Sequence, residues 1–258
     1  MKAKKRFGQN FLVNPHWLTY IAEAVSQFRG DALVEIGGGT GNLTRELAEL
    51  DFPRFVVVEI DRDLIPILRD ISPKIEVVQG NILDIPLDFG KKQVIAGNLP
   101  YYITKPILNH LISHRDSVAG GVLMVQREVG AALTAPVHSE NYNAYSVYLR
   151  LFAHVEKLRT VKRGDFRPVP NVDSTLLKIT MRPSSEVSVS GKEADILFRA
   201  FRERRKTLVN NLKKEYNKEV VIAFLDSLGK SPEARAQELT VDEFSRLLDR
   251  LKKGGDDQ

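Results

Sequence analysis

Cysteine is absent from this sequence, and so is any long hydrophobic stretch. Without cysteine, disulfide bonds, thiolate nucleophiles and cysteine-ligated metals are excluded together. No apolar run approaches the roughly 20 residues that a membrane-spanning helix needs, and the basic N-terminus lacks the apolar segment of a secretory signal. We therefore expect a cytoplasmic protein without a membrane partner.

Residue arrangements typical of metal sites and of nucleophilic hydrolases are also missing. His110 and His114 stand four residues apart on a predicted helix, which is the spacing of some metal sites. No glutamate follows His110 and no third ligand is evident, so a surface or packed pair is the better interpretation. No Ser–His–Asp arrangement is indicated. We expect no metal.

Positive charge is present in two clusters. The 258 residues carry a formal net charge of +5, a moderate excess whose distribution matters more than its size. Four of the first six residues are Lys or Arg, and residues 199–214 hold seven basic residues against one acid, Glu203. A solvated helix face explains either cluster alone equally well. The two together favour a polyanionic partner.

From about Ala32 the chain alternates short apolar, β-branched runs with segments of helical periodicity. This alternation is typical of parallel strands that are buried on both faces and joined by crossover helices. The runs are residues 32–36, 55–59, 75–78, 94–96 and 121–125, and the helical segments include 42–50, 63–70 and 103–114. Two later runs, 155–161 and 176–181, have no long helix between them and can pair antiparallel at the end of the sheet. The pattern predicts an α/β fold.

After Arg182 the character of the sequence changes. Residues from about Lys192 onward predict three short helices and no strand, with Pro232 early in one of them. Thr240-Val241-Asp242-Glu243 resembles a capping box at the start of the last helix. We therefore expect an α/β domain over residues 1–182 and a small all-α domain over residues 183–258.

The first strand runs directly into a glycine-rich loop, Glu35-Ile36-Gly37-Gly38-Gly39-Thr40-Gly41-Asn42. Glycine lets the backbone approach a ligand closely. A dinucleotide fingerprint needs glycine at the sixth position from Gly37, where Asn42 stands, and this argues against an NAD-binding oxidoreductase. The pattern E-x-G-x-G-x-G instead resembles the first motif of class I methyltransferases. No phosphate-loop lysine is present, which disfavours a nucleoside triphosphate.

A carboxylate ends the second strand. Glu59 follows Gly41 by eighteen residues and can accept both hydrogen bonds of a ribose diol, while Ile60 is placed to pack on an adenine face. An ordinary strand-to-helix turn would explain the glycines alone but not the glycines together with this acid. The combination predicts a nucleoside-cofactor site. Glu35, before the loop, is expected to hydrogen-bond the backbone.

The fourth strand ends in Asn98-Leu99-Pro100-Tyr101, which resembles the [Asp/Asn]-Pro-Pro-aromatic motif of methyltransferases that act on amino groups. An adenine N6 amine is a poor nucleophile because its lone pair is conjugated into the ring. The Asn98 oxygen and the Leu99 carbonyl can each accept one N6–H bond and so aim the lone pair at a methyl donor. Tyr101 offers a face for stacking an extruded base. A plain turn before a helix near Thr104 is the alternative, but ligands bind where parallel strands end.

With these residues assembled, the chain resembles the ribosomal RNA adenine N6-dimethyltransferase family along nearly its whole length. Four further segments match family motifs in the right order: Phe7–Leu12, Met124–Val129, Phe166–Ser174 and Arg204–Leu212. The resemblance implies a class I S-adenosylmethionine-dependent methyltransferase with a seven-stranded, mostly parallel sheet and a small helical C-terminal domain. It also implies dimethylation of two adjacent adenines near the 3′ end of 16S rRNA in the small (30S) ribosomal subunit or its precursor, by a monomer.

The resemblance further implies a role for individual residues. S-adenosylmethionine is expected to contact Asn10, Leu12, Gly37, Gly39, Gly41, Glu59, Ile60, Asn81, Ile82 and Asn98. Asn98, Leu99 and Tyr101 are expected to handle the target base, with Phe166 as a second stacking ring. RNA phosphates are expected to bind Lys4, Lys5 and Arg6 and a basic helix that contains Arg204, Arg205 and Lys206.

Some residues depart from the pattern of the family. Asn81 stands where the family usually has an Asp that meets the adenine amine, and Ala132 stands where it often has an Arg.

The nearest rival is a resistance-type methyltransferase of large-subunit rRNA, but that branch typically has Ile at the position of Leu99. Another rival is a non-catalytic ribosome-assembly or nucleic-acid-binding factor on the same fold, which loss of Asn98 or Tyr101 would have favoured.

Overall fold

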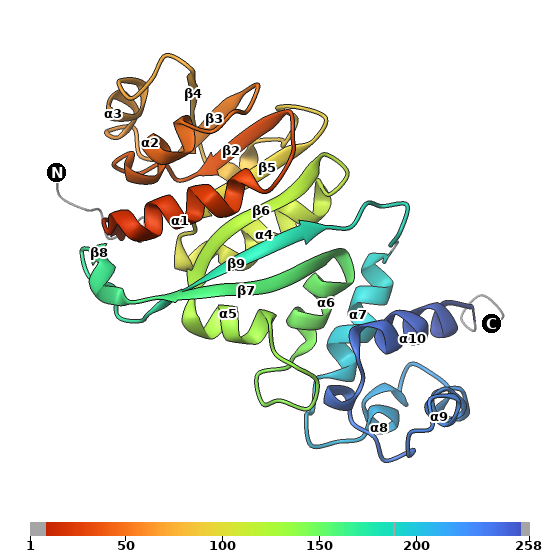
Figure 1. The fold of residues 1–258 in the computed structure, drawn as a ribbon. Helices are drawn as coiled ribbons and strands as arrows, with labels where there is room; N and C mark the ends of the chain where they lie inside the picture. The colour runs from red at the N-terminus through yellow and green to blue at the C-terminus, as the bar shows by residue number, and fades with distance from the viewer. Residues whose placement is uncertain (1–8, 188, 254–258) are drawn as a thin grey trace. The chain divides into compact units, whose positions relative to one another are not determined.

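In the computed structural model, which describes residues 9–187 and 189–253, seven strands form one sheet in the order β4-β3-β2-β5-β6-β9-β7 (Figure 1). The strands are β2 (Ala32–Ile36), β3 (Phe55–Glu59), β4 (Ile75–Gln79), β5 (Gln93–Asn98), β6 (Val118–Gln126), β7 (Ala153–Val161) and β9 (Ser174–Met181). Strands β2 to β6 pair in parallel, whereas β9 pairs antiparallel with both β6 and β7. The predicted parallel sheet and its antiparallel end are confirmed.

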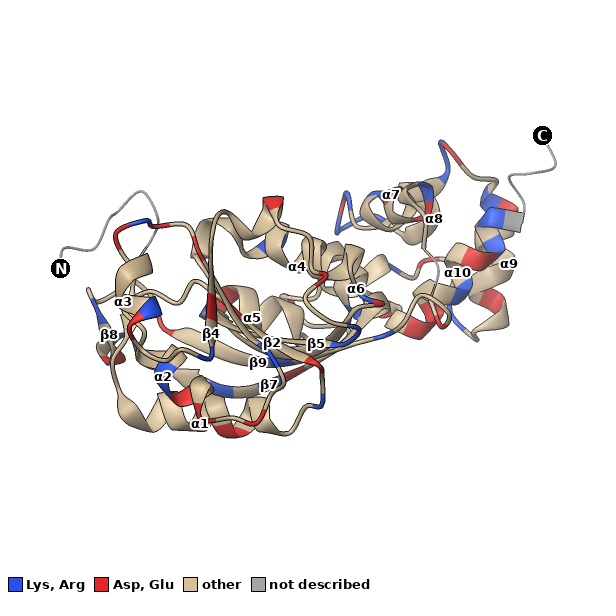
Figure 2. Cartoon of the chain, turned by 90° about the horizontal axis from the view of Figure 1, so that it is seen from above, with Lys and Arg blue, Asp and Glu red and all other residues tan. Residues whose placement is uncertain are grey.

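Apolar side chains on both faces explain why β2 and β3 are interior strands of the sheet. Every residue of β2 and β3 is buried, as expected for parallel strands covered by helices. Seen from above, helices α1 (Pro15–Ser26) and α2 (Asn42–Ala48) lie on one side of the strands and α4 (Thr104–Ser113) on the other (Figure 2). The other helices between the parallel strands β2 to β6, within the described residues, are α3 (Ile65–Arg69) and the 3₁₀ helices η2 (Ile82–Asp84) and η3 (Tyr101–Ile103).

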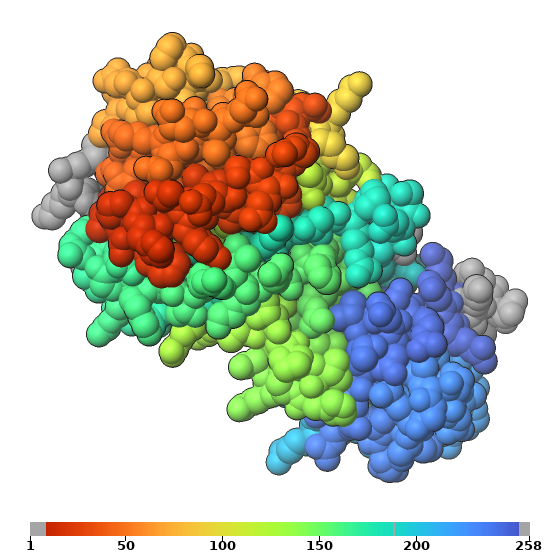
Figure 3. Space-filling model, in the orientation of Figure 1, coloured from red at the N-terminus to blue at the C-terminus, as the bar shows by residue number. Residues whose placement is uncertain are grey.

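The residues before α1, 9–14, form a segment that we call the N-terminal strap. Its strand β1 (Phe11–Leu12) pairs antiparallel with β8 (Phe166–Arg167), which follows the 3₁₀ turn η4 (Arg163–Asp165). In the space-filling view, the N-terminal part of the chain (red) lies directly against the segment that follows β7 (green) (Figure 3). Asn14 caps α1 by accepting a hydrogen bond from the His16 amide, and Pro15 suits the first helical position.

Contacts divide the chain into two units that are interleaved in sequence. The first comprises the described residues up to Gly130 together with Ala153–Ser184, and the second comprises Ala131–Phe152 and the described residues from Ser185 onward. The predicted boundary near residue 183 therefore misses one segment of the second unit. The reason is α6 (Ala144–Phe152), whose apolar face packs against α7 (Gly191–Ala200) and α10 (Val241–Lys253). Helix α5 (Arg127–Leu133) begins in the first unit and ends in the second.

The C-terminal part of the second unit contains four α-helices within its described residues, not the three that were predicted. They are α7 (Gly191–Ala200), α8 (Leu208–Leu212), α9 (Lys218–Ser227) and α10 (Val241–Lys253). Pro232 lies in a turn after α9 rather than early in a helix. None of the helices in the described residues combines the length and hydrophobicity that crossing a membrane requires.

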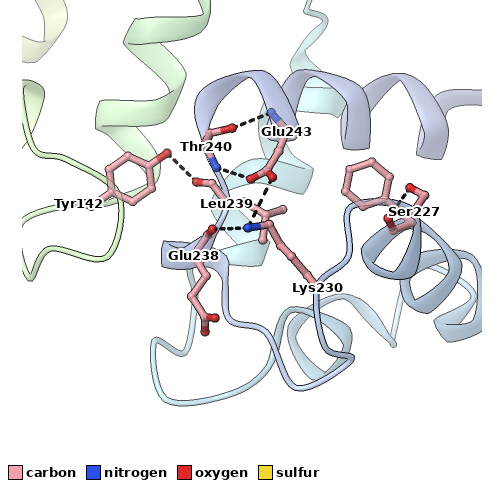
Figure 4. Close-up of polar contacts among 8 residues, drawn as sticks. Tyr142, Ser227, Lys230, Glu238, Leu239, Thr240 and Glu243 are labelled. Carbon is pink, nitrogen blue, oxygen red and sulfur yellow. Dashed lines mark hydrogen bonds and ion pairs between the residues drawn. The ribbon is translucent and has the colours of Figure 1, made fainter.

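A polar network holds the start of α10 (Figure 4). The Thr240 amide donates to Glu243 Oε2 at 2.8 Å, and the Glu243 amide donates to Thr240 Oγ1 at 3.1 Å, which confirms the predicted capping box. Beside it, the fully buried Tyr142 donates its hydroxyl to the Leu239 carbonyl at 2.9 Å. Burial raises the pKa of Tyr142 to about 12. Tyr142 thus ties the internal segment 131–152 to the C-terminal residues of the same unit.

Replacement of Tyr142 by phenylalanine tests this tie. Tyr142→Phe leaves the buried Leu239 carbonyl without its partner, so we expect the free energy of unfolding to fall by about 1–3 kcal/mol. Urea denaturation of the full chain measures the loss. Tyr102→Phe is the control, because that side chain is 59% exposed and its substitution should change stability by no more than about 0.5 kcal/mol. Equal effects of the two substitutions would contradict a structural role of the Tyr142 hydroxyl.

Candidate functional site

A cavity opens where the parallel strands of the first unit end. Strands β2, β3 and β5 and the turn after β4 each contribute residues to its wall, and the N-terminal strap closes one side. Its lining is Gln9, Asn10, Phe11, Ile36, Gly37, Gly39, Val58, Glu59, Ile60, Gly80, Asn81, Ile82 and residues 98–103. The carboxyl ends of parallel strands are the usual ligand-binding edge of an open α/β sheet. The structure thus brings most of the sequence-predicted site residues together.

The glycine loop after β2 has a conformation that few other residues adopt. Gly37 and Gly41 have φ angles of +76° and +79°, in the left-handed region. A Cβ added at Gly37 would meet no atom within 4 Å, so a side chain there would project into open space beside the cavity. At Gly41 a Cβ would lie 2.4 Å from Ile71, and this glycine does not line the cavity. Gly41 therefore allows close packing of the loop, and the cofactor contact predicted for it stays a prediction.

Glu59 is buried at the end of β3 and supports the glycine loop. Its Oε2 accepts a hydrogen bond from the Gly39 amide at 2.9 Å, and its Oε1 accepts one from the Asp61 amide at 2.8 Å. Burial raises the pKa of Glu59, and these two amide donors oppose that rise. Each carboxylate oxygen has a second lone pair, so a ribose diol can still donate to both. Ile60 follows with its side chain 43% exposed at the cavity, as packing on a base would require.

Asn98 lies at the end of β5 with its amide held in one orientation. Its Nδ2 donates to the backbone carbonyl of Asn10 in the N-terminal strap at 2.8 Å. The reverse orientation would set the Asn98 oxygen against that carbonyl, and two acceptors repel. The Asn98 Oδ1 is therefore the atom that remains to accept a hydrogen bond from a substrate. The adjoining turn is fixed, because the Leu99 amide donates to the Met124 carbonyl at 3.0 Å.

Tyr101 and Phe166 are placed very differently. Tyr101 lines the cavity, and its hydroxyl shares a 2.9 Å hydrogen bond with Ser174 Oγ that fixes the ring. Burial raises the pKa of Tyr101. The ring of Phe166 is fully buried among the core side chains under β1 and does not line the cavity. Pairing of β8 with β1 places Phe166 in the core of this structure, away from the cavity where it was expected, and its stacking on the target base stays a prediction.

Asn81 and Leu12 meet their predicted places only in part. Asn81 lines the cavity, but its Oδ1 caps η2 by accepting from the Leu83 amide at 3.2 Å. Its Nδ2 donates to Asp84 Oδ2 at 3.2 Å, a contact that an aspartate at this position could not make. Leu12 is buried beside a smaller neighbouring cavity, outside the main lining.

Eight residues of the cavity lining were not among the predicted site residues, and three of them, Gln9, Phe11 and Tyr102, carry polar or aromatic side chains. Gln9 donates from its Nε2 to Asp61 Oδ2 at 2.9 Å, the Phe11 ring packs against Gly39, and Tyr102 is exposed at the cavity. These three residues could have been predicted from their neighbours in the sequence, because Gln9 and Phe11 flank Asn10 and Tyr102 follows Tyr101.

The predicted basic helix of residues 199–214 is interrupted by a turn. Helix α7 ends at Ala200, and α8 begins only after Thr207, whose hydroxyl accepts from the Asn210 amide at 3.1 Å. Asn211 Nδ2 closes the turn by donating to the carbonyls of Ala200 at 2.8 Å and Glu203 at 3.1 Å. The polar side chains Thr207 and Asn211 thus break the helical pattern that the sequence indicated.

The six predicted RNA-binding residues fall into three groups. Arg204 donates to the backbone carbonyls of Tyr142 at 2.6 Å and Glu140 at 3.1 Å, so its guanidinium stabilises the fold of the second unit. Arg205 and Lys206 are exposed, and Lys206 pairs with Glu203 at 2.8 Å. Lys4, Lys5 and Arg6 lie outside the described residues.

Glu35 is buried in β2 behind the glycine loop, where it lines the smaller cavity. Within the described residues its Oε2 has no hydrogen-bond partner, which differs from the expected bond to the backbone. Burial raises the pKa of Glu35 to about 8, and the nearby charge of Glu59 adds to the rise. The described residues contain no group of three His, Cys, Asp or Glu that could hold a metal ion.

The pKa of Glu35 predicts a dependence of stability on pH. Because the folded protein holds the Glu35 proton up to about pH 8 and the unfolded chain loses it near the ordinary value of 4.5, stability falls as pH rises between these values. The slope is at most about 1.4 kcal/mol per pH unit. Glu35→Gln keeps the shape without titrating and should flatten this part of the profile. Urea denaturation midpoints of both proteins at pH 5 to 8 test this expectation. If stability depends on pH in the same way in both proteins, the raised pKa of Glu35 is refuted.

Comparisons with known proteins agree with this geometry. A model of the family described as ribosomal RNA adenine dimethylase matches residues 1–253. The ribosomal RNA small subunit methyltransferase A of Staphylococcus aureus (strain MRSA252) is 35% identical over 268 residues, which cover 97% of this chain and 90% of that protein.

Solved structures give the same result. A dimethyladenosine transferase from Plasmodium falciparum matches with a TM-score of 0.84 and 28% identity over 95% of this chain and 98% of that chain. The 23S rRNA methyltransferase ErmE matches with a TM-score of 0.75 and 26% identity over 94% and 99%. The predicted class I methyltransferase fold is confirmed. The chain belongs to the ribosomal RNA adenine dimethylase family.

Proposed function

We propose that this protein transfers methyl groups from S-adenosylmethionine to the N6 amines of two adjacent adenines near the 3′ end of 16S rRNA. Its partner would be the small (30S) ribosomal subunit or its precursor, and it would act as a cytoplasmic monomer. The observation on which this mainly rests is the fixed amide of Asn98 at the cavity, with Oδ1 as its remaining acceptor. The similarity to a small subunit methyltransferase over 97% of the chain supports the choice of subunit.

The residues of the cavity fit S-adenosylmethionine. Gly37 leaves open space where any side chain would intrude, and Glu59 keeps lone pairs for a ribose diol beside the exposed Ile60. Asn10, Gly39, Asn81, Ile82 and Asn98 complete the proposed contacts. When bound, S-adenosylmethionine supplies an electrophilic methyl group on its sulfonium.

The chain's own part in the reaction is to orient the amine. Asn98 Oδ1 and the Leu99 carbonyl each accept one N6–H bond, which frees the nitrogen lone pair from the ring and directs it toward the methyl donor. Tyr101, held by Ser174, provides the face on which the extruded adenine stacks. No general base is needed if the proton leaves after methyl transfer.

A second candidate is methylation of large-subunit rRNA, which the likeness to ErmE favours. Leu99 stands against it, because the resistance-type branch typically has Ile there. We therefore keep the small subunit as the proposed substrate.

Mass spectrometry of both ribosomal RNAs separates the candidates. After incubation of unmethylated small and large subunits with the protein and labelled S-adenosylmethionine, we expect dimethyladenosine at two adjacent positions of the small-subunit RNA. Asn98→Ala should cut single-turnover transfer by about 10²–10³-fold, the scale for loss of one preorganised polar contact. RNA affinity should hardly change. Label in large-subunit RNA only would refute the substrate, and a wild-type rate for Asn98→Ala would refute the mechanism.

Binding of RNA phosphates by the second unit gives a further test. Each lost phosphate contact lowers the salt slope of RNA affinity by about 0.7–0.9, so Arg205→Ala with Lys206→Ala should lower it by about 1.4–1.8. Arg204→Ala should instead lower the thermal stability, since Arg204 holds the carbonyls of Tyr142 and Glu140. RNA titrations at several salt concentrations provide the slopes. An unaltered slope in the double variant would remove both residues from the interface.

A further inference from the structure

Asp165 lies at the end of η4, outside the cavity lining, yet each of its oxygens bonds to the N-terminal strap or to α1. Its Oδ1 accepts from Asn14 Nδ2 at 2.7 Å, and its Oδ2 accepts from Trp17 Nε1 at 3.1 Å. Its backbone carbonyl accepts from the Val13 amide at 2.9 Å. A carboxylate that accepts two side-chain donors in a half-buried place forms stronger hydrogen bonds than a neutral acceptor would. Asp165 therefore fastens the end of the strap.

The other end of the strap reaches the cavity. Asn42 Nδ2, at the start of α2, donates to the Leu12 carbonyl at 2.9 Å, and the Phe11 ring packs against Gly39. One residue earlier, the Asn10 carbonyl accepts the hydrogen bond from Asn98 Nδ2. The place of that carbonyl thus depends on the course of the whole strap.

We propose that Asp165 is a positioning residue for methyl transfer: by fastening the N-terminal strap it fixes the Asn10 carbonyl and, through it, the orientation of the Asn98 amide. This rests on the proposed function of Asn98. If the strap moves away, the terminal amide of Asn98 can rotate, because such torsions are soft and roughly two-fold. In the wrong orientation the amide presents a donor to the N6 amine, which is itself a donor, and the reactive geometry is lost.

A purely structural anchor would behave differently. It would lower the stability of the first unit without a specific link to Asn98. The two roles are therefore separated by whether the effect of changing Asp165 requires the Asn98 side chain.

The first measurement is single-turnover methyl transfer to unmethylated small subunits at saturating RNA and cofactor, well below the melting temperature. Asp165→Asn keeps the volume but sets an NH₂ group against one of two donors. We expect the rate to fall by about 10- to 100-fold, the scale for a small misplacement of a positioned group. Glu76→Gln is the matched control, because it breaks an exposed ion pair with Arg54 that is remote from the strap. Its rate should stay at the wild-type value. A wild-type rate for Asp165→Asn would overturn the proposal.

The second measurement repeats Asp165→Asn in the Asn98→Ala background. If Asp165 acts through the Asn98 amide, the additional loss should be less than about two-fold, since the group that it orients is gone. The same fold-loss in both backgrounds would overturn the proposal. If the wild-type protein has no activity on either ribosomal subunit, the proposed function is contradicted instead. The anchoring of the strap by Asp165 is then tested by hydrogen exchange alone.

Hydrogen exchange and a second variant keep the test independent of activity and of folding. In Asp165→Asn the amides of Phe11, Leu12 and Val13 should exchange faster while those of β2 and β3 keep their protection. Uniformly faster exchange would indicate general destabilisation and overturn the proposal. Trp17→Phe keeps an aromatic ring and removes only the Nε1 donor, so it should lower the rate by several-fold, less than Asp165→Asn. The Trp17→Phe variant tests the proposal even if Asp165→Asn does not fold.

Discussion

Parallel pairing of β2 with β3 on one side and β5 on the other is the constraint on which the site depends. Ile36 lies opposite Val58, and Glu35 lies opposite both Val57 and Ala96. In this register the residues just beyond the pairs emerge at one edge of the sheet: the glycine loop, the Glu59 carboxylate and the Asn98 amide. Burial of each large aliphatic side chain in these strands contributes about 1.5–3 kcal/mol, so the register is strongly held. The functional groups need only be placed at the strand ends.

The same constraint explains how much was predictable from sequence. Strands buried on both faces are continuous apolar runs, and the runs at residues 32–36 and 55–59 coincide with β2 and β3. Parallel order then places the ends of these strands together without any knowledge of side-chain contacts. The glycine loop, Glu59 and the Asn98 turn were therefore correctly predicted to lie at one edge of the sheet. Capping hydrogen bonds could also be predicted, because they join residues that are close in the sequence, as in the capping box at Thr240.

What sequence reasoning missed depends on contacts between residues far apart in the chain. The Asn98–Asn10 bond spans 88 residues, and the Tyr142–Leu239 bond spans 97. Neither leaves a periodic trace in the sequence. The burial of Phe166 was not foreseen, because a motif identifies a residue but not its surroundings, which here depend on pairing of β8 with β1. The basic segment was predicted as one helix because its charged residues favour a helix. In the structure Thr207 caps the start of α8 and Asn211 Nδ2 donates to the Ala200 carbonyl at the end of α7, so two helices form with a turn between them.

The interleaving of the two units has a consequence for synthesis on the ribosome. Helix α6 is made before β7 and β9, yet the helices that cover its apolar face, α7 and α10, come from the C-terminal residues. The apolar face of α6, with Val147, Leu149 and Phe152, therefore gains these partners only after all seven strands of the sheet have been synthesised. Because Gly130 and Ala153 both belong to the first unit, the segment between them is attached to that unit at both ends. Attachment at both ends raises the effective concentration of α6 for α7 and α10 of the same chain, and so favours packing within one chain over packing between chains.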